Sequence, residues 1–419
     1  MKSSQTIAES IEKIENTISR LISFLERNDF KGWEPYELPE LSWLKSNKLR
    51  TVTTQLLRLF PISLHSYFSE KKLHPKAAAL FAQAFLNLHE ITNEQGYYET
   101  ALFFLEWLIA HRSAQSKHFS IGNLHQLSMK TYHALPDTPS PLITCFAVEA
   151  FISAYEASQD QRFLQMAESG IKFFLEELPL RNVSDNECFF VYHPNNEQFI
   201  PNAPAAISGT LSRFFGISKE PSLLRVIKNN FNYIAKWQKS DGSWLYHPDS
   251  GYVDNFHTAF ILEALAKFQF YTDDDSFETN LSKGVSFYSK TFFKSTGKPI
   301  HKKRSGFPTN ADSLLTKIDL RDIAMGLSVF SSLHSTDANQ LAVALNLLDW
   351  SVENFKSKQG YFYYQKVPLY TIKGPFLRMQ AWMLYGLSKM LQILKNLETS
   401  SKKGNRLYDQ IETKFVKSL

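Results

Sequence analysis

Two predicted helices in the second half of the chain begin with residues that can transfer protons. Asp254 precedes an apolar helical segment, and His257 follows three residues later, which places both side chains on one face of the helix. A carboxylate beside an imidazole can act as a general acid or base near neutral pH. The same residues can serve the fold instead, with Asp254 capping the helix and His257 bonding a loop carbonyl. The two roles of Asp254 are compatible, so we expect this pair near a functional site.

Asp319 and Asp322 repeat this spacing at the start of the next such helix, with Arg321 between them. Glycosidases with paired carboxylates need one acid and one base or nucleophile, and their separation sets inversion or retention. Asp254 with Asp322, or with Asp319, is therefore the first candidate catalytic pair. Arg321 is a candidate substrate-binding residue. The structural alternative is a set of helix caps and an ion pair between Arg321 and an aspartate.

Arg378 and Gln380 open the last long apolar helix. A guanidinium in this place suits bidentate recognition of a carboxylate, such as that of a uronic acid, or of a phosphate. The alternative is an ion pair between helices. Asn255, next to Asp254, can bond a sugar hydroxyl or cap its own helix.

Aromatic and polar residues gather in the turns and at the helix starts. Aromatic rings bind sugar faces through apolar contact, and their polar tips anchor hydroxyls. Each residue alone is more typical of packing within its turn, but a set around one rim favours a carbohydrate cleft, because several rings are needed to line a pocket. The candidate wall consists of Trp33, Tyr36, His193, Asn202, Trp244, Tyr246, His247, Tyr363, Tyr364 and Trp382.

Apolar residues recur at helical spacing along most of the chain. The amphipathic segments are 5–28, 50–69, 75–91, 97–113, 141–157, 161–176, 204–216, 221–238, 256–270, 277–293, 321–334, 337–355 and 376–397. Two stretches with strand-like alternation, 189–193 and 360–364, are expected to be extended arms of turns rather than sheet strands.

The helices follow a repeat of an outer helix, a turn, a polar loop and an inner helix. Inner helices begin near Asn202, Asp254, Asp319 and Arg378, at intervals of 52, 65 and 59 residues. Each interval accommodates two helices and a loop. Less regular units in the first half bring the total to six, the number that closes an α/α ring. The sequence therefore predicts one all-α domain over residues 1–397, an (α/α)6 toroid with short extended turns, and a polar tail or short capping helix over 398–419.

Composition excludes several classes of protein. The net charge of +5 is small for 419 residues and does not indicate a nucleic-acid binder. The two cysteines rule out a disulfide scaffold, and no Cys/His spacing indicates zinc, so we expect no metal site and no cofactor. No run of 18 apolar residues predicts a membrane span, and no signal peptide is evident. The expectation is a soluble cytoplasmic protein, with its oligomeric state left open.

Several short motifs resemble a known family. They are GWEPY at 32–36, FPISL at 60–64, HPKA at 74–77, QKSDGSW at 238–244, VDNFHT at 253–258, LEAL at 262–265 and QAWML at 380–384. Together they resemble a family found among bacterial polysaccharide-biosynthesis proteins and assigned by fold to the six-hairpin glycosidase-like toroids. The resemblance implies a glycan or sugar precursor as the partner.

The chain departs from the family pattern at two positions. Arg321 stands where the family usually has a histidine, and Met379 where it has a tryptophan. The segment 121–129 also lacks the expected tryptophans. Each loss removes a ring that can stack on a sugar or carry a proton, so a changed specificity or a loss of catalysis stays an alternative.

A second resemblance concerns the segment from Tyr233 to Trp244, which is similar to the QW motif of triterpene cyclases. The acidic cluster that protonates an isoprenoid in those enzymes is absent, and the three aspartates at 273–275 fall in a loop. The sequence thus favours a carbohydrate-active hydrolase, lyase or epimerase that uses Asp254, His257 and Asp322. The alternatives are a non-catalytic glycan-binding or assembly protein and an isoprenoid-handling toroid.

Overall fold

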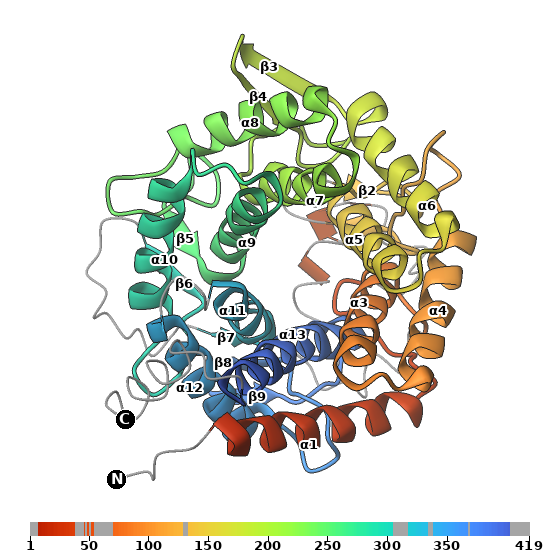
Figure 1. The fold of residues 1–419 in the computed structure, drawn as a ribbon, viewed down its shortest axis with the longest axis vertical. Coiled ribbons are helices and arrows are strands. Elements are labelled where there is room, and N and C mark those ends of the chain that lie inside the picture. Colours follow the sequence, from red (N-terminus) through yellow and green to blue (C-terminus); the bar gives the residue numbers. More distant parts are fainter. Residues whose placement is uncertain are drawn as a thin grey trace.

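The computed structural model describes residues 7–37, 46, 48–49, 52–53, 70–128, 133–304, 317–333, 338–367 and 369–402. In this part of the chain, helices form two concentric rings (Figure 1). The inner ring consists of α3 (Pro75–Thr92), α5 (Pro141–Ser158), α7 (Asn202–Ser218), α9 (Asn255–Thr272), α11 (Leu320–Leu333) and α13 (Leu377–Lys402). The outer ring consists of α1 (Ile7–Glu26), α4 (Gln95–Ala110), α6 (Gln161–Lys172), α8 (Pro221–Lys236), α10 (Glu278–Phe292) and α12 (Ala338–Phe355).

The inner ring is closed. Each inner helix packs against the inner helices before and after it, and α13 returns to pack against α3. The first outer helix, α1, lies along α13, so segments from both ends of the sequence form one hairpin (Figure 1). The fold class expected from the sequence, an all-α (α/α)6 toroid, is confirmed.

Burial differs between the rings for a geometric reason. An outer helix contacts the ring on one side only, and α1 accordingly buries a stripe that includes Ile7, Ile11, Ile14 and Ile18. An inner helix has neighbours on several sides, and every residue of α3 from 77 to 82 is buried. The periodic outer segments and the continuous apolar inner segments of the sequence therefore correspond to the two rings.

Short antiparallel strands connect the helix starts. They are β1 (Leu127–Ser128), β2 (His133–Ala134), β3 (Leu180–Ser184), β4 (Glu187–Phe190), β5 (Tyr252–Asp254), β6 (Lys302–Arg304), β7 (Ile318–Asp319), β8 (Gln365–Val367) and β9 (Tyr370–Ile372). β5 pairs with β6, and β8 pairs with both β7 and β9, so loops from consecutive hairpins are joined beside the starts of α9 and α11.

The sequence missed part of this pairing. Phe189 and Phe190 belong to β4, which pairs with β3 in a hairpin, so the expectation of an unpaired extended arm was wrong there. The stretch 360–364 lies outside the strands, as expected, and forms an isolated bridge through Phe362.

The helix boundaries match the periodicity closely. The four predicted inner starts lie within one residue of the observed ones at 202, 255, 320 and 377. The last helix runs to Lys402, beyond the expected domain boundary at 397. The predicted helix 50–69 and the tail 403–419 fall almost wholly outside the described residues. None of the helices in the described ranges is both long and apolar enough to cross a bilayer.

Aromatic rings fill the centre of the inner ring. Trp382, 1% exposed, meets Phe146, Phe256 and Phe260 edge to face at centroid distances of 5.0, 5.6 and 6.1 Å. These rings come from α5, α9 and α13, so they join three inner helices across the axis. We call this group the aromatic floor.

Gly242 allows the turn after α8 to approach α10. Its φ of +90° is unfavourable for other residues, and an added Cβ would lie 2.3 Å from the Lys283 carbonyl oxygen. We predict that Gly242→Ala lowers the free energy of unfolding by about 3 kcal/mol, measured by chemical denaturation. Gly251→Ala, in the same loop with open space at the Cβ, is the matched control and is expected to change it by less than about 0.5 kcal/mol. Equal effects of the two substitutions would contradict this account.

Candidate functional site

The inner helices start at the same end of the ring, and charged side chains of several starts meet there. We call this end the N-terminal mouth and define it by Asp254, His257, Asp319, Arg321, Asp322, Lys76 and Arg378, together with Glu34 and His301 from the adjoining loops. The opposite end, where the inner helices finish, is called the C-terminal basin.

Asp254 and His257 form a dyad at the start of α9. The buried Asp254 caps the helix by accepting from the His257 backbone N–H at 2.8 Å, and its oxygens lie 2.7 and 2.9 Å from His257 Nδ1. Burial alone would raise the pKa of Asp254, but the charge and hydrogen bonds of His257 outweigh it and hold the pKa below its usual range. The ionised carboxylate only accepts, so Nδ1 donates, and in the uncharged form of the ring the lone pair lies on Nε2. The expected cap and the expected pairing are both present.

A second dyad lies beside the first. His301 donates from Nδ1 to Asp322 at 2.8 Å, and both side chains are buried. β5–β6 pairing places Asp254 opposite Lys302, and the Asn255 N–H donates to the His301 carbonyl oxygen at 2.9 Å. Burial raises the pKa of Asp322, although the His301 charge opposes it. Two aspartate–histidine pairs therefore stand at adjacent inner helix starts.

Asp319 holds Arg321 in place. Arg321 donates from Nε and Nη2 to the two Asp319 oxygens, both at 2.9 Å, and Gln365 donates to Asp319 at 2.6 Å. Burial would raise the pKa of Asp319, but Arg321 and then Lys317 hold it well below its usual value. The guanidinium lies 4.8 Å above the Phe256 ring of the aromatic floor and its side chain is 17% exposed. The Arg–Asp ion pair considered as the structural alternative is the one observed.

Two further cations stand near Arg321. Arg378 pairs from Nε with the fully buried Glu34 at 2.8 Å and donates to Asn123 at 3.1 Å. Half-buried Lys76 places Nζ 5.3 Å from the Phe146 ring centroid. Burial lowers the pKa of Lys76 to about 7, and the charges of Arg378 and Arg321 contribute, while Glu34 opposes them. Burial also raises the pKa of Glu34 to about 7. Lys76 and Arg321 therefore lie over rings of the aromatic floor, and each of the two arginines has its own carboxylate partner.

Several expected wall residues are instead buried in the turns. Trp244 is 2% exposed and donates from Nε1 to the Ile234 carbonyl oxygen at 3.0 Å. Asn255 accepts from the Tyr288 hydroxyl at 2.7 Å, and Gln380 bonds the Phe362 backbone through both ends of its amide at 2.8 Å. Because the polar groups of these side chains form hydrogen bonds within the protein, the side chains stabilise the turns. The sequence could not distinguish this role, since a turn aromatic or amide looks the same whichever way it points.

The remaining expected residues divide between mouth and surroundings. Tyr36 lies under Arg378 at 5.6 Å, and Tyr246 meets His257 edge to face at 4.6 Å, so both border the mouth. Half-buried Trp33 packs under Lys71 at 4.8 Å and half-buried Tyr363 under Lys373 at 5.8 Å. His193 and His247 each accept a hydrogen bond from a backbone N–H in their own turns. Asn202 and Tyr364 are buried, and Trp382 belongs to the aromatic floor.

Three important mouth residues were not predicted. Lys76 lies in the HPKA motif and Glu34 in the GWEPY motif, so both stood in segments already singled out. His301 lies in a loop without a distinctive pattern, and only strand pairing with β5 brings it to Asp254.

Glu37, His74 and His125 form a further cluster whose ligand atoms lie within 4.8 Å of one another. Burial lowers the pKa of His74 to about 4 and that of His125 well below its usual value, so both imidazoles are neutral.

The C-terminal basin is a cavity of about 920 Å³. Its charges neutralise one another: Arg213 and Lys267 pair with Glu149 at 2.8 and 2.9 Å, and Lys389 pairs with Glu263 at 2.8 Å. The cavity is large, but the proton-transfer pairs lie at the other end. We therefore treat the N-terminal mouth as the candidate site, because it combines a partly exposed histidine with cations close to one another.

Solved structures of several sugar-acting enzymes share this fold. An unsaturated glucuronyl hydrolase specific for heparin has a TM-score of 0.61 at 11% identity, covering 91% of this chain and 96% of its own. A cellobiose 2-epimerase from Bacillus thermoamylovorans has a TM-score of 0.56 at 13% identity, covering 75% of this chain and 87% of its own. A GH76 α-mannanase from Bacteroides thetaiotaomicron has a TM-score of 0.56 at 10% identity, covering 79% and 89%.

At these identities the likeness concerns the fold alone. It shows that the chain folds as an (α/α)6 toroid. No protein-family model matches the sequence, and no curated protein matches it.

The buried Asp319–Arg321 pair should contribute to stability. We predict that Asp319→Asn lowers the free energy of unfolding by about 3 kcal/mol, because it leaves Arg321 without its counterion. The folded-state pKa of Asp319 is depressed, so this contribution is complete above the unfolded-state pKa of about 3.9 and is lost as the pH falls below it. Denaturant titrations at pH 7 and at pH 3 measure the difference.

Asp160→Asn is the matched control for this substitution. Asp160 makes the same two-residue contact with Arg162 but on the surface, and asparagine retains its capping role. A clearly smaller effect is expected for Asp160→Asn at both pH values. If Asp319→Asn were as stable as the wild type at pH 7, the proposal that Asp319 stabilises the buried guanidinium of Arg321 would be wrong.

Proposed function

We propose that the protein is a carbohydrate-active enzyme that transfers protons at a sugar carbon, in the manner of an epimerase, isomerase or lyase. The observation that carries the proposal is the dyad of Asp254 and His257, with buried Asp254 fixing the tautomer of a histidine whose side chain is 23% exposed. A base held in this way has its Nε2 lone pair available to a ligand.

The second dyad supports a two-group mechanism. His301 lies beside Asp254 through β5–β6 pairing and is oriented by Asp322. In such a mechanism one group removes a proton from the substrate, and a second group returns a proton or assists elimination. Two titratable groups must therefore lie near one substrate. We assign His257 as the base that touches the substrate, His301 as the candidate second group, and Asp254 and Asp322 as their positioning residues.

Hydrolysis by two carboxylates is less well supported. Such a mechanism needs one carboxyl group as the acid and another as the base or nucleophile. Here Asp254 and Asp322 are each engaged by a histidine and Asp319 by Arg321, Lys317 and Gln365. The carboxylates can still stabilise a charged transition state. The products of the reaction therefore decide between hydrolysis and proton transfer at carbon.

The cations of the mouth point to an acidic sugar. The charges of Arg378 and Arg321 lower the pKa of Lys76, which shows that the three cations lie close enough to repel one another. A carboxylate on the ligand would relieve this repulsion. The aromatic floor below them offers an apolar surface for a sugar face. We infer a uronic-acid-containing glycan or its precursor as the substrate, in bacterial polysaccharide biosynthesis or processing.

Proton transfer can be measured directly with a panel of reducing oligosaccharides, with and without uronic acids, in deuterated water. Incorporation of deuterium at a sugar carbon, followed by mass spectrometry, is expected for an acidic member of the panel. We predict that Asp254→Asn and His257→Ala lower this rate about 100-fold or more while the circular dichroism spectrum is unchanged.

Asp249→Asn, an exposed aspartate in the same loop, is the matched control and is expected to retain the wild-type rate. Full activity of Asp254→Asn would refute the assignment of the dyad. Release of new reducing ends with neither deuterium at carbon nor an unsaturated sugar would identify a hydrolase, an unsaturated product would identify a lyase, and binding without turnover would identify a glycan-binding protein.

The charge of Lys76 gives a separate prediction about the substrate. Lys76→Met keeps the length of the side chain and removes its charge, so we expect at least tenfold weaker binding of acidic oligosaccharides, a change of about 1.4 kcal/mol, with neutral ones unaffected. Isothermal titration calorimetry measures both. Lys72→Met, an exposed lysine four residues earlier, is the control with the same change of charge. Equal losses for acidic and neutral oligosaccharides would argue against recognition of an acid group.

A further inference from the structure

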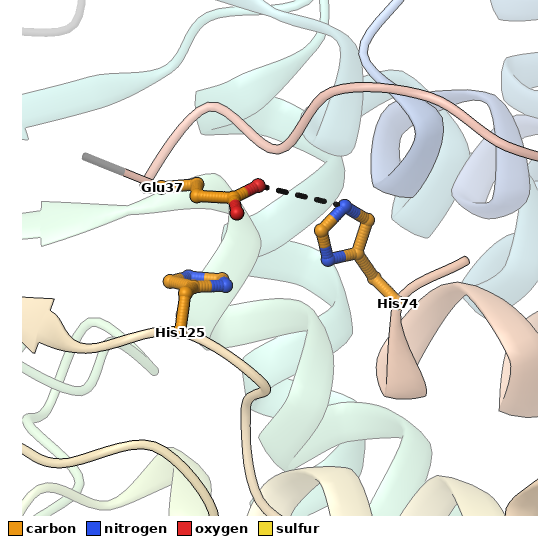
Figure 2. Close-up of side chains that lie close together, drawn as sticks. All are labelled: Glu37, His74 and His125. Atoms are coloured by element: carbon orange, nitrogen blue, oxygen red, sulfur yellow. Dashed lines mark ion pairs between the residues drawn. The ribbon is translucent and has the colours of Figure 1, made fainter. Parts of the chain in front are cut away.

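Three segments far apart in the sequence meet beside the start of α3. Glu37 follows the turn after α1, His74 immediately precedes α3, and His125 lies in the loop before β1. Their carboxylate and imidazole groups point toward one another (Figure 2). One ligand atom from each residue lies within 4.8 Å of the others.

Several polar atoms of this cluster have no hydrogen-bond partner among the described residues. They are His74 Nδ1, both ring nitrogens of His125 and Glu37 Oε2. His74 is 1% exposed and His125 is 8% exposed, so water does not compensate freely for the missing bonds. Buried polar atoms almost always have partners, and leaving one unsatisfied costs about 1–3 kcal/mol. Four such atoms in one cluster therefore indicate a site for a ligand.

The His74 ring is already oriented for binding. Its Nε2 lies 3.2 Å from the Gly32 carbonyl oxygen, which only accepts, so Nε2 donates and the lone pair lies on Nδ1. Metal-binding histidines commonly donate their other N–H to a backbone carbonyl in this way. Glu37 Oε2 lies 3.9 Å from the Nε2 atom of this ring (Figure 2).

We propose that Glu37, His74 and His125 bind a divalent transition metal ion, with Zn²⁺ as the reference ion. Two imidazole nitrogens and one carboxylate oxygen are a donor set that zinc accepts, and they leave a further position for water. Ligand atoms around a tetrahedral zinc ion lie about 3.3 Å apart, so the cluster must contract by about 1.5 Å at most from its present spacing. Side-chain rotations of Glu37, in a loop, can supply this change.

The ion would connect the segments that support the mouth. The loop that carries Glu37 also carries Glu34, which pairs with Arg378, and the loop of His125 carries Asn123, which accepts from the same arginine. A shared metal would therefore fix both partners of Arg378 relative to α3. This proposal does not depend on the reaction at the mouth, because metal binding can be measured without a sugar.

The test uses the full chain freed of metal by a chelator and then titrated with Co²⁺ and with Zn²⁺. One equivalent of Co²⁺ is expected to produce the visible absorption of a four-coordinate site, and Zn²⁺ is expected to displace it and raise the melting temperature. His125→Ala and Glu37→Gln are each expected to weaken binding at least tenfold and to abolish the thermal shift.

His89→Ala, half-buried at the far end of the same helix, is the matched control and should bind as the wild type does. Glu37→Gln is nearly isosteric, so its circular dichroism spectrum shows whether folding is retained independently of the histidine substitution. Absence of binding to the wild type would overturn the proposal. So would binding that Glu37→Gln and His125→Ala leave unchanged, which would place the metal on surface histidines.

Discussion

The contact between α3 and α13 is the constraint on which the N-terminal mouth depends. It closes the inner ring and thereby brings Lys76, from the first inner helix, to Arg378, from the last. The loop after α1 is fixed to the same junction, because the Leu377 N–H donates to the Trp33 carbonyl oxygen at 3.0 Å and an added Cβ on Gly32 would lie 2.9 Å from Leu377 Cβ. Groups from opposite ends of the sequence can share one site only because this junction forms.

Most of the fold, and half of the site, could be predicted from the sequence because the signals were local. Helical periodicity identifies the two rings, and the spacing of Asp254 and His257 places them together whatever the rest of the chain does. His301 could not be found in this way, since two helices, α9 and α10, separate it from Asp254 and strand pairing brings the two together. Trp244 was expected at the surface of a cleft, yet its indole N–H bonds the end of α8, and nothing local distinguishes an inward ring from an outward one.

The two ends of the ring differ in how their charges are used. In the C-terminal basin, cations and carboxylates of different inner helices pair directly, as Lys389 does with Glu263 and Arg213 with Glu149. These ion pairs connect different inner helices, and their opposite charges largely cancel. At the mouth, Arg321 pairs with Asp319 and Arg378 with Glu34, and two further carboxylates, Asp254 and Asp322, each bond a histidine. The mouth therefore differs from the basin in that its carboxylates also orient imidazoles, which can transfer protons.

The packing of α1 against α13 has a consequence for how the chain is made. A ribosome that adds about 5–20 residues per second needs on the order of 20–75 s to proceed from the end of α1 to the end of α13. Throughout that interval the isoleucine stripe of α1 lacks the surface on which it finally rests. The hairpin of α1 and α13 therefore cannot form until almost all of the described chain has been made.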